Sequence, residues 1–490
     1  MDAAERLRDL LEDSVKVQGL AGSLLWRGGW RNGGGGAGRR AGTHTHLRST
    51  SIHFSLQAQL ALGASSALAT LFAVLRRGNA ATIRPVLECL AVALAQQPPQ
   101  QGQPPSTAPL PGAINAELFS RMEGSLALVL GLLAPDAAMA SDFGARYYAA
   151  RLLTACAVAN PGRAVAALLG APAGVGRVMD LVADPHDAVR NEALILALTL
   201  ARTSPDVQQV AVLEGGFERL LNLVAAEGGT DGGAVVQDCL DLVAALVARH
   251  AGNGVQFQEA GHLGRLVPLL RQVDPVKKPS PQQAANIGAV LDVVVALVDR
   301  DATPVVALPG QPVGPRGDAA ALASAARANQ DALVSAGLVP TLVALCLDNG
   351  GMPEEGVRVR AMTALAALVR ACPPGQAALG GATISVVGRT LPVVQALLRT
   401  ALRAPAPAER VAGDSVLAGL CEANSGGQVG LAGTITPVER GEVEERGTGR
   451  RGRAAPTALG PRLRPPAFLT LKRALRCSLA SHYPSHACQA

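Results

Sequence analysis

A short apolar pattern recurs along this chain: two apolar residues, a one-residue gap, and two more. Its copies begin at Val86, Val129, Val178, Leu220, Leu266, Leu342 and, more weakly, Val393. The successive intervals are 43, 49, 42, 46, 76 and 51 residues. All but the interval of 76 lie near the period of about 40 to 47 residues that is typical of helical repeat proteins. The pattern predicts tandem helical units.

Residues 187–228 show one such unit in full. A first helix, which Asp187 can cap, has apolar residues on two faces, Val189, Ala193, Leu196 and Leu200 on one and Leu194 and Leu198 on the other. Ser204-Pro205 predicts the start of a second helix, because serine caps helices and proline fits their first position. A third helix should run from Phe217 to the glycine pair 228–229.

Three short helices, each with an apolar face, cannot bury those faces alone, so neighbouring units must stack. We therefore predict an all-α protein, an armadillo-like α-solenoid. It would be a right-handed superhelix of about six to seven three-helix repeats, with a long concave groove suited to protein binding. The Pro- and Gly-rich stretch 303–318 falls in the longest interval and is expected to be a surface loop.

Charge divides the chain into three parts. Residues 1–51 and 435–490 together hold 18 of the 44 basic residues and 9 of the 38 acidic ones, so 52–434 has 26 basic and 29 acidic residues. We predict a folded head at 52–434. The two ends are expected to be disordered tails or wrongly translated sequence. A slightly acidic body argues against a nucleic-acid partner, which needs clustered basic residues.

Targeting signals and cysteines indicate the compartment. The eight cysteines are scattered without a CxxC pair, which fits free buried thiols in the reducing cytoplasm better than a disulfide framework. The charged first residues do not look like a signal peptide. The uncharged stretch 49–75 is long enough for a membrane span, but its Gln, Ser and Ala content favours a buried helix.

Individual residues resemble one particular family. The segments are GRVMDL (176–181), VRN (189–191), FERLL (217–221) and DGGAVVQDCL (231–240), with weaker similarity upstream from Asp142 and downstream to Gly261. This set is similar to the head of the general vesicular transport factor family, closely over about 140–265 and loosely over about 60–430. Generic armadillo proteins do not carry the DGG and VVQDC sequence after FERLL.

The resemblance implies a non-enzymatic tether for vesicles in endoplasmic reticulum-to-Golgi and intra-Golgi transport. Such proteins dimerise, bind Rab-type GTPases, the fusion machinery and Golgi tethers, and attach peripherally to the cytosolic face of the Golgi membrane. Family members continue into a coiled coil and an acidic tail, whereas residues after 435 show no apolar heptads. The candidate interaction or signature residues are Arg190, Asn191, Phe217, Glu218, Arg219, Asp231, Gly232, Gly233 and Asp238.

Two interpretations of Arg190 and Asn191 stay open. The structural one is that they join neighbouring repeats through hydrogen bonds to loop carbonyls. The functional one is that Asn191 lines the groove and holds an extended peptide. For Asp231-Gly232-Gly233, a turn and helix cap is favoured over a metal loop, because no further carboxylates follow at alternate positions.

Catalytic and metal-binding patterns are weak. Gly174-x-Gly176 lacks the third glycine of a dinucleotide-binding loop. His186, His250 and His262 are not at ligand spacing with another His or Cys. A zinc-like set at the C-terminus, Cys477, His482, His486 and Cys488, has poor spacing. We therefore expect no catalytic residues, no metal and no cofactor.

The main alternative function is that of another peptide-binding armadillo protein. A nuclear import adaptor would present tryptophans along its groove, and 52–434 contains none. A chaperone nucleotide-exchange factor remains compatible with the sequence. An enzyme with an unrecognised site is a further alternative that no motif supports.

Overall fold

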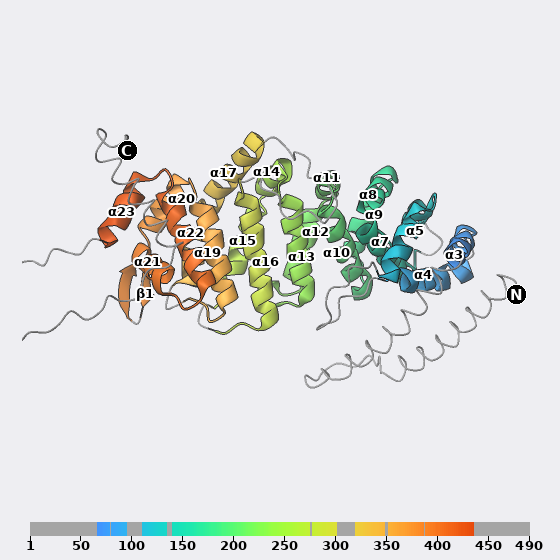
Figure 1. Ribbon diagram of the computed structural model, residues 1–490, viewed down its shortest axis with the longest axis horizontal. Helices are drawn as coiled ribbons and strands as arrows, with labels where there is room; N and C mark the ends of the chain where they lie inside the picture. The colour runs from blue at the N-terminus through green and yellow to red at the C-terminus, as the bar shows by residue number, and fades with distance from the viewer. Residues whose placement is uncertain are drawn as a thin grey trace, which may run out of the picture. The chain divides into compact units, whose positions relative to one another are not determined.

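The structure, a computed structural model, describes residues 66–78, 80–95, 110–134, 140–274, 277–300, 319–347, 351–386 and 388–435 (Figure 1). These residues form 21 α-helices, one 3-10 turn and one two-stranded sheet, so the predicted all-α class is confirmed. They divide into two compact units with the boundary after Gly174. The candidate zinc residues, the loop 303–318 and most of the stretch 49–75 lie outside the described residues.

The helices of unit 1 are α3 (Ala67–Arg76), α4 (Ala80–Leu94), α5 (Pro111–Arg121), α6 (Ser125–Leu132), α7 (Phe143–Ala159) and α8 (Pro161–Gly170). The boundary falls at the start of α9 (Gly174–Val182). Unit 2 continues with α10 (Asp187–Ala201), α11 (Pro205–Leu213), α12 (Gly216–Ala226), η1 (Gly229–Asp231), α13 (Ala234–Val247), α14 (Ala251–Glu259), α15 (Leu263–Arg271) and α16 (Pro281–Val298). It then holds α17 (Ala319–Ser335), α18 (Leu338–Cys346), α19 (Glu355–Val369), α20 (Pro373–Gly380), β1 (Thr383–Val386), β2 (Arg389–Pro392), α21 (Val393–Arg403), α22 (Pro407–Cys421) and α23 (Ser425–Ile435).

A long helix followed by two further helices is the repeating order along the chain. The first helices of these units are α4, α7, α10, α13, α16, α19 and α22, and we call them the long helices, although α17 is of similar length. In unit 2, α10, α13, α16, α19 and α22 pack side by side in sequence order, and we call them the long-helix layer (Figure 1). In unit 1, α4 packs on α7 in the same way. This order agrees with six to seven three-helix repeats.

The unit at 187–228 forms as its apolar spacing predicts. All four residues of the first predicted face of α10 are buried, at 3% exposure or less. The Ser204 Oγ accepts a hydrogen bond from the Val207 N–H at 3.3 Å, and Pro205 begins α11. Asp187 is the first residue of α10 rather than its cap, a position that His186 takes. α12 ends at Ala226, and Gly228 after it has φ 92°, a conformation that glycine adopts without strain.

Close packing in the layer depends on a glycine of α22. A Cβ added at Gly419 would lie 3.0 Å from the Ala366 carbonyl of α19. The missing side chain therefore lets the two helices approach, which explains a glycine in the middle of a helix where its intrinsic propensity is poor.

The hairpin β1–β2 is the one element type among the described residues that periodicity did not predict. Its strands pair antiparallel, from Thr383 opposite Pro392 to Val386 opposite Arg389. Only four residues long each, the strands lie between α20 and α21 and leave the helical order intact.

The described cysteines agree with the sequence interpretation of buried free thiols. The described cysteines form no disulfide; Cys89 is half-buried, and the other five are buried, namely Cys156, Cys239, Cys346, Cys372 and Cys421. Burial raises the pKa of the Cys156, Cys239 and Cys346 thiols to about 12. At neutral pH these side chains therefore behave as small apolar residues.

Among the described helices, α16 alone is long and apolar enough to span a membrane, with a mean hydropathy of 1.4. Two bent pairs of helices meet the same criteria only if each pair is taken as one span. Most of α16 is buried in the layer between α13 and α19. The side chain of Asn286, on α16, also donates hydrogen bonds to the Thr230 and Gly232 carbonyls. We therefore assign α16 to the core.

Candidate protein-interaction surface

Three carboxylates gather on the long-helix layer. Asp238 and Asp241 lie on α13 and Asp292 lies on α16, where its Oδ2 is 3.2 Å from the Arg360 Nη1 of α19. Burial raises the pKa of all three carboxyls. The charge of Asp241 raises the pKa of the other two further, while Arg360 lowers that of Asp292. Asp241 is thus coupled to both Asp238 and Asp292, while the charges of Arg202 and Arg360 lower its own pKa. We call these three carboxylates the acidic patch.

Arg190 joins two elements of its own repeat. Its Nη2 lies 3.1 Å from the Asp187 carboxylate and 3.1 Å from the Glu227 carboxylate at the end of α12. Its partners are thus carboxylates rather than the expected loop carbonyls. The neighbouring Asn191 is half-buried, and its Oδ1 has no hydrogen-bond partner in the described structure.

The FERLL signature divides between core and surface. Phe217 is buried with its ring centroid 4.9 Å from that of Phe257, at an interplanar angle of 86°. Arg219 Nη1 donates to Asp180 at 2.9 Å and so joins α12 to α9. Glu218 is exposed. Only Glu218 and the outer part of Arg219 are available to a partner.

The DGG signature positions a turn against α16. The Asn286 amide donates to the Thr230 carbonyl at 3.1 Å and to the Gly232 carbonyl at 2.8 Å. A Cβ at Gly232 would lie 2.4 Å from the Glu227 carbonyl, whereas one at Gly233 would meet nothing within 4 Å. Asp231 accepts from the Gln283 amide at 2.5 Å. The signature is a docked turn, but no side chain caps α13.

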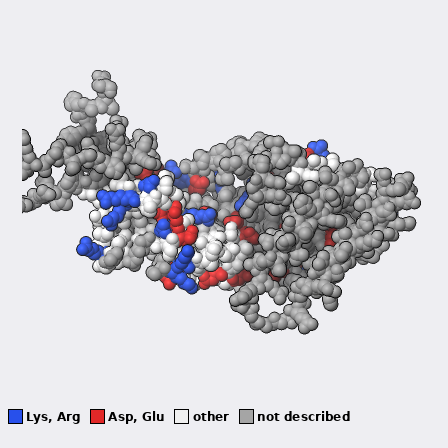
Figure 2. Space-filling model, turned by 60° about the horizontal axis from the view of Figure 1, so that its bottom comes forward, with Lys and Arg blue, Asp and Glu red and all other residues white. Residues whose placement is uncertain are grey.

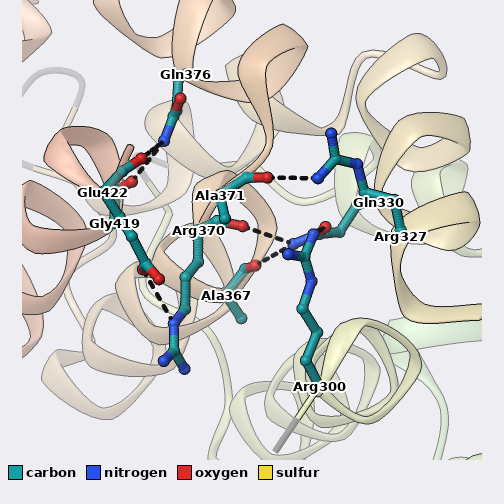
Figure 3. Close-up of polar contacts among 9 residues, drawn as sticks. All are labelled: Arg300, Arg327, Gln330, Ala367, Arg370, Ala371, Gln376, Gly419 and Glu422. Carbon is teal, nitrogen blue, oxygen red and sulfur yellow. Dashed lines mark hydrogen bonds and ion pairs between the residues drawn. The ribbon is translucent and has the colours of Figure 1, made fainter. Parts of the chain in front are cut away.

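Buried amides that sequence reasoning missed bind the ends of the long helices, the asparagines within one repeat and the glutamines between successive repeats (Figure 3). Asparagines donate to carbonyls at the end of the preceding long helix: Asn115 to Ala93, Asn253 to Leu246 and Asn329 to Leu297. Glutamines donate to the end of the next long helix: Gln208 to Ala245, Gln330 to Ala367 and Arg370, and Gln376 to Gly419 and Glu422. We call these the amide positions. Gln330 and Gln376 are 46 residues apart, and this repeat spacing was the signal available in the sequence.

Arginines surround the same helix ends. Arg327 Nη1 donates to the Ala371 carbonyl at 2.7 Å, and Arg370 pairs with Glu422 at 3.1 Å (Figure 3). Arg300 donates to the Gln330 side chain. Burial and the charge of Arg327 lower the pKa of Arg300. Cations at helix C-termini offset the negative end of the helix dipole, so this cluster stabilises the ends of α16 and α19.

Histidines serve structural roles. His250 Nδ1 accepts from the Asn253 N–H at 3.1 Å and so caps α14. His262 lies against Phe217 and Phe257. No group of three or more His, Cys, Asp or Glu residues within the described ranges could hold a metal ion.

Comparisons with known proteins identify proteins that are similar to this chain in sequence and in fold. No family model matches the chain. Golgin candidate 6 of Arabidopsis thaliana is 29% identical over 384 residues, covering 78% of this chain and 39% of the relative. General vesicular transport factor p115 of Bos taurus is 32% identical over 193 residues, covering 39% of this chain and 20% of the relative. These names confirm the resemblance to the general vesicular transport factor family.

A solved structure, that of Uso1-1, matches with a TM-score of 0.63 and 24% identity over 79% of this chain and 61% of the other. This likeness supports the armadillo-like solenoid as the fold. The chain spans 39% and 20% of the length of the two relatives described.

Proposed function

We propose that this chain is the head of a vesicle tethering and docking factor in endoplasmic reticulum-to-Golgi and intra-Golgi transport. The observation that carries the proposal is the similarity to a golgin candidate over most of the chain, joined by the p115 relative. A stacked-helix array supports it, because such arrays present an extended surface to other proteins. In this proposal the chain acts as a scaffold before membrane fusion and performs no catalysis.

The long-helix layer is the surface that we assign to partner binding. It carries the acidic patch of Asp238, Asp241 and Asp292, together with Ile195, whose side chain is 45% exposed. In a protein interface an apolar core is surrounded by a polar rim, and we assign Ile195 to such a core and the carboxylates to its rim.

The expected partners are a Rab-type GTPase, components of the fusion machinery and other Golgi tethers. We further propose a homodimer that attaches peripherally to the cytosolic face of the Golgi membrane through those partners, in the cytoplasm and without nucleic acid.

A direct binding panel tests this function. The purified chain is titrated with Rab-type GTPases in GTP-analogue and GDP forms, with Golgi fusion proteins, and with the nucleotide-binding domain of an Hsp70-type chaperone. We expect binding to at least one GTP-form GTPase or fusion protein. Binding to the chaperone domain alone would instead support the nucleotide-exchange alternative and refute tethering.

A pair of charge reversals locates the surface. Asp292→Arg inverts a charge of the acidic patch, whereas the control Asp206→Arg inverts an exposed charge on α11, outside the layer. Partner binding should weaken in Asp292→Arg and stay unchanged in Asp206→Arg. Equal effects of the two reversals would remove the long-helix layer as the binding surface.

A further inference from the structure

A cavity of about 300 Å³ opens between α18, α19, α21 and α22 in unit 2. Its polar lining consists of Arg358, Arg399, Thr400, Arg403 and Glu409. Three cations and one carboxylate give this lining a net charge of +2. The acidic patch and the amide positions do not include any of these residues.

The floor of the cavity is an internally paired carboxylate. Glu409 is 6% exposed, and the Arg358 Nε donates to its Oε1 at 2.5 Å. Arg358 is itself held by donation to the Met352 carbonyl at 2.5 Å. Because Glu409 is already paired with Arg358, it does not neutralise the charges of the other two arginines of the lining, Arg399 and Arg403.

Those arginines lie one turn apart on α21. Arg399 and Arg403 are exposed, and neither makes a hydrogen bond or an ion pair with the part of the chain that the structure describes. α21 contains no acidic residue, and like charges four residues apart repel each other. Figure 2 shows Lys and Arg side chains gathered at one end of unit 2. An anion in the cavity would relieve this repulsion and give both guanidinium groups a partner.

The charge and size of the cavity select the anion. A phosphate monoester carries about −1.5 to −2 charges at neutral pH and has three strong acceptor oxygens. It therefore matches a lining of +2 better than a single carboxylate does. Two guanidinium forks can donate to several of its oxygens at once, and the Thr400 hydroxyl can add a third donor.

We propose that this cavity binds the phosphate monoester headgroup of a membrane lipid. Leu402 lies between the two arginines in sequence and is 37% exposed, and Arg389 is exposed on the adjoining β2. Exposed basic and apolar side chains on one helix and on the strand packed against it suit the interface of an anionic bilayer, where Leu402 would enter the headgroup region. The choice of a lipid rather than a phosphopeptide rests on the proposed function, which brings the chain to a membrane.

Vesicle sedimentation tests the site. The full chain is mixed with vesicles that contain phosphatidylinositol 4-phosphate, and with phosphatidylserine vesicles of the same surface charge. The double variant Arg399→Gln/Arg403→Gln is compared with Arg77→Gln/Arg163→Gln, which removes two exposed arginines of unit 1 that make no ion pair with described residues. Matching circular dichroism and melting curves establish that each variant is folded.

We expect the wild-type chain to prefer the phosphate monoester vesicles. The cavity variant should bind them about tenfold or more weakly, because two charge-assisted contacts are lost, and the unit 1 variant should bind like the wild type. Soluble inositol 1,4-bisphosphate should compete. Equal binding to phosphatidylserine, or equal loss in both double variants, would show only general electrostatic attraction and overturn the site. Binding of a phosphoserine peptide without binding of the vesicles would overturn the lipid as its occupant.

The same variants separate this site from the tethering proposal. The cavity variant should keep its GTPase or fusion-protein binding in the panel described above. If that binding persists while the arginine substitutions leave lipid binding unchanged, the cavity inference fails and the tethering proposal stands. If the panel gives no partner while lipid binding depends on the arginines, the tethering proposal fails.

Discussion

Gln208 offers the sharpest test of the amide positions. Its side chain is 7% exposed, and its Nε2 donates to the Ala245 carbonyl of α13 at 2.7 Å. Ala245 is among the last residues of α13, whose carbonyls have no helical donor. Gln208→Leu keeps a similar volume and removes the only described donor to this carbonyl.

The expected cost follows from the state of the Ala245 carbonyl. A buried acceptor that loses its partner costs about 1 to 3 kcal/mol, more than the net value of an ordinary hydrogen bond. Leucine regains part of this through apolar burial, so we expect a loss of about 1 to 2 kcal/mol in the free energy of unfolding. The adjacent Gln209 is exposed, and Gln209→Leu should change stability by less than about 0.5 kcal/mol.

Urea denaturation followed by circular dichroism measures this difference, with hydrogen exchange at the end of α13 as a local readout. Repeat proteins can unfold in parts, so the exchange rates show whether the loss is centred on the junction of α11 and α13. A Gln208→Leu variant as stable as Gln209→Leu would refute the role assigned to the amide positions.

Three further predictions use matched or self-controlled changes. Gly232→Ala should cost about 1 to 3 kcal/mol, because its Cβ would lie 2.4 Å from a carbonyl, while Gly233→Ala, which meets nothing, should be nearly neutral in the same urea assay. Ala371→Gly should raise stability by about 0.5 to 1 kcal/mol, because φ at Ala371 is 46°, and an unchanged urea midpoint would contradict this. Asp238→Asn should raise the melting temperature at pH 7 but not at pH 3. Burial and the charge of Asp241 raise the pKa of Asp238 above 3.8 in the folded chain. The folded state therefore loses stability as pH rises through that pKa and Asp238 ionises, a loss that asparagine avoids. The same gain at both pH values would exclude this cause.

The sequence predicts the helices of this fold well because burial in stacked helices imposes a local period. Val189, Ala193, Leu196 and Leu200 repeat at helical spacing, and all four are buried in α10. Capping is equally local, so Ser204-Pro205 marks the start of α11 correctly. The hairpin at 383–392 escapes such reasoning, because strands of four residues carry too little alternation to be recognised.

Contacts between helices are harder to predict, because they depend on how repeats stack. Arg190 and Glu227 are 37 residues apart, and only the register of α10 against α12 makes them partners. Phenylalanine is a residue type that is enriched at interfaces, but Phe217 lies in the core. The spacing of the amides is visible in the sequence, yet their burial and their acceptors are not. Residues that identify related proteins therefore do not by themselves identify a binding surface.

The cavity beside α21 shows the same limit at a functional level. The apolar spacing from Val393 correctly predicts the buried face of this helix, including Leu397. The same spacing leaves Arg399 and Arg403 on the outer face, where a solvated role would be the default interpretation. Only the approach of α22 places the paired Glu409 behind them and leaves two cations beside a carboxylate that is already neutralised. A local pattern thus predicts which side of a helix is free, whereas the charge balance on that side is set by its neighbours.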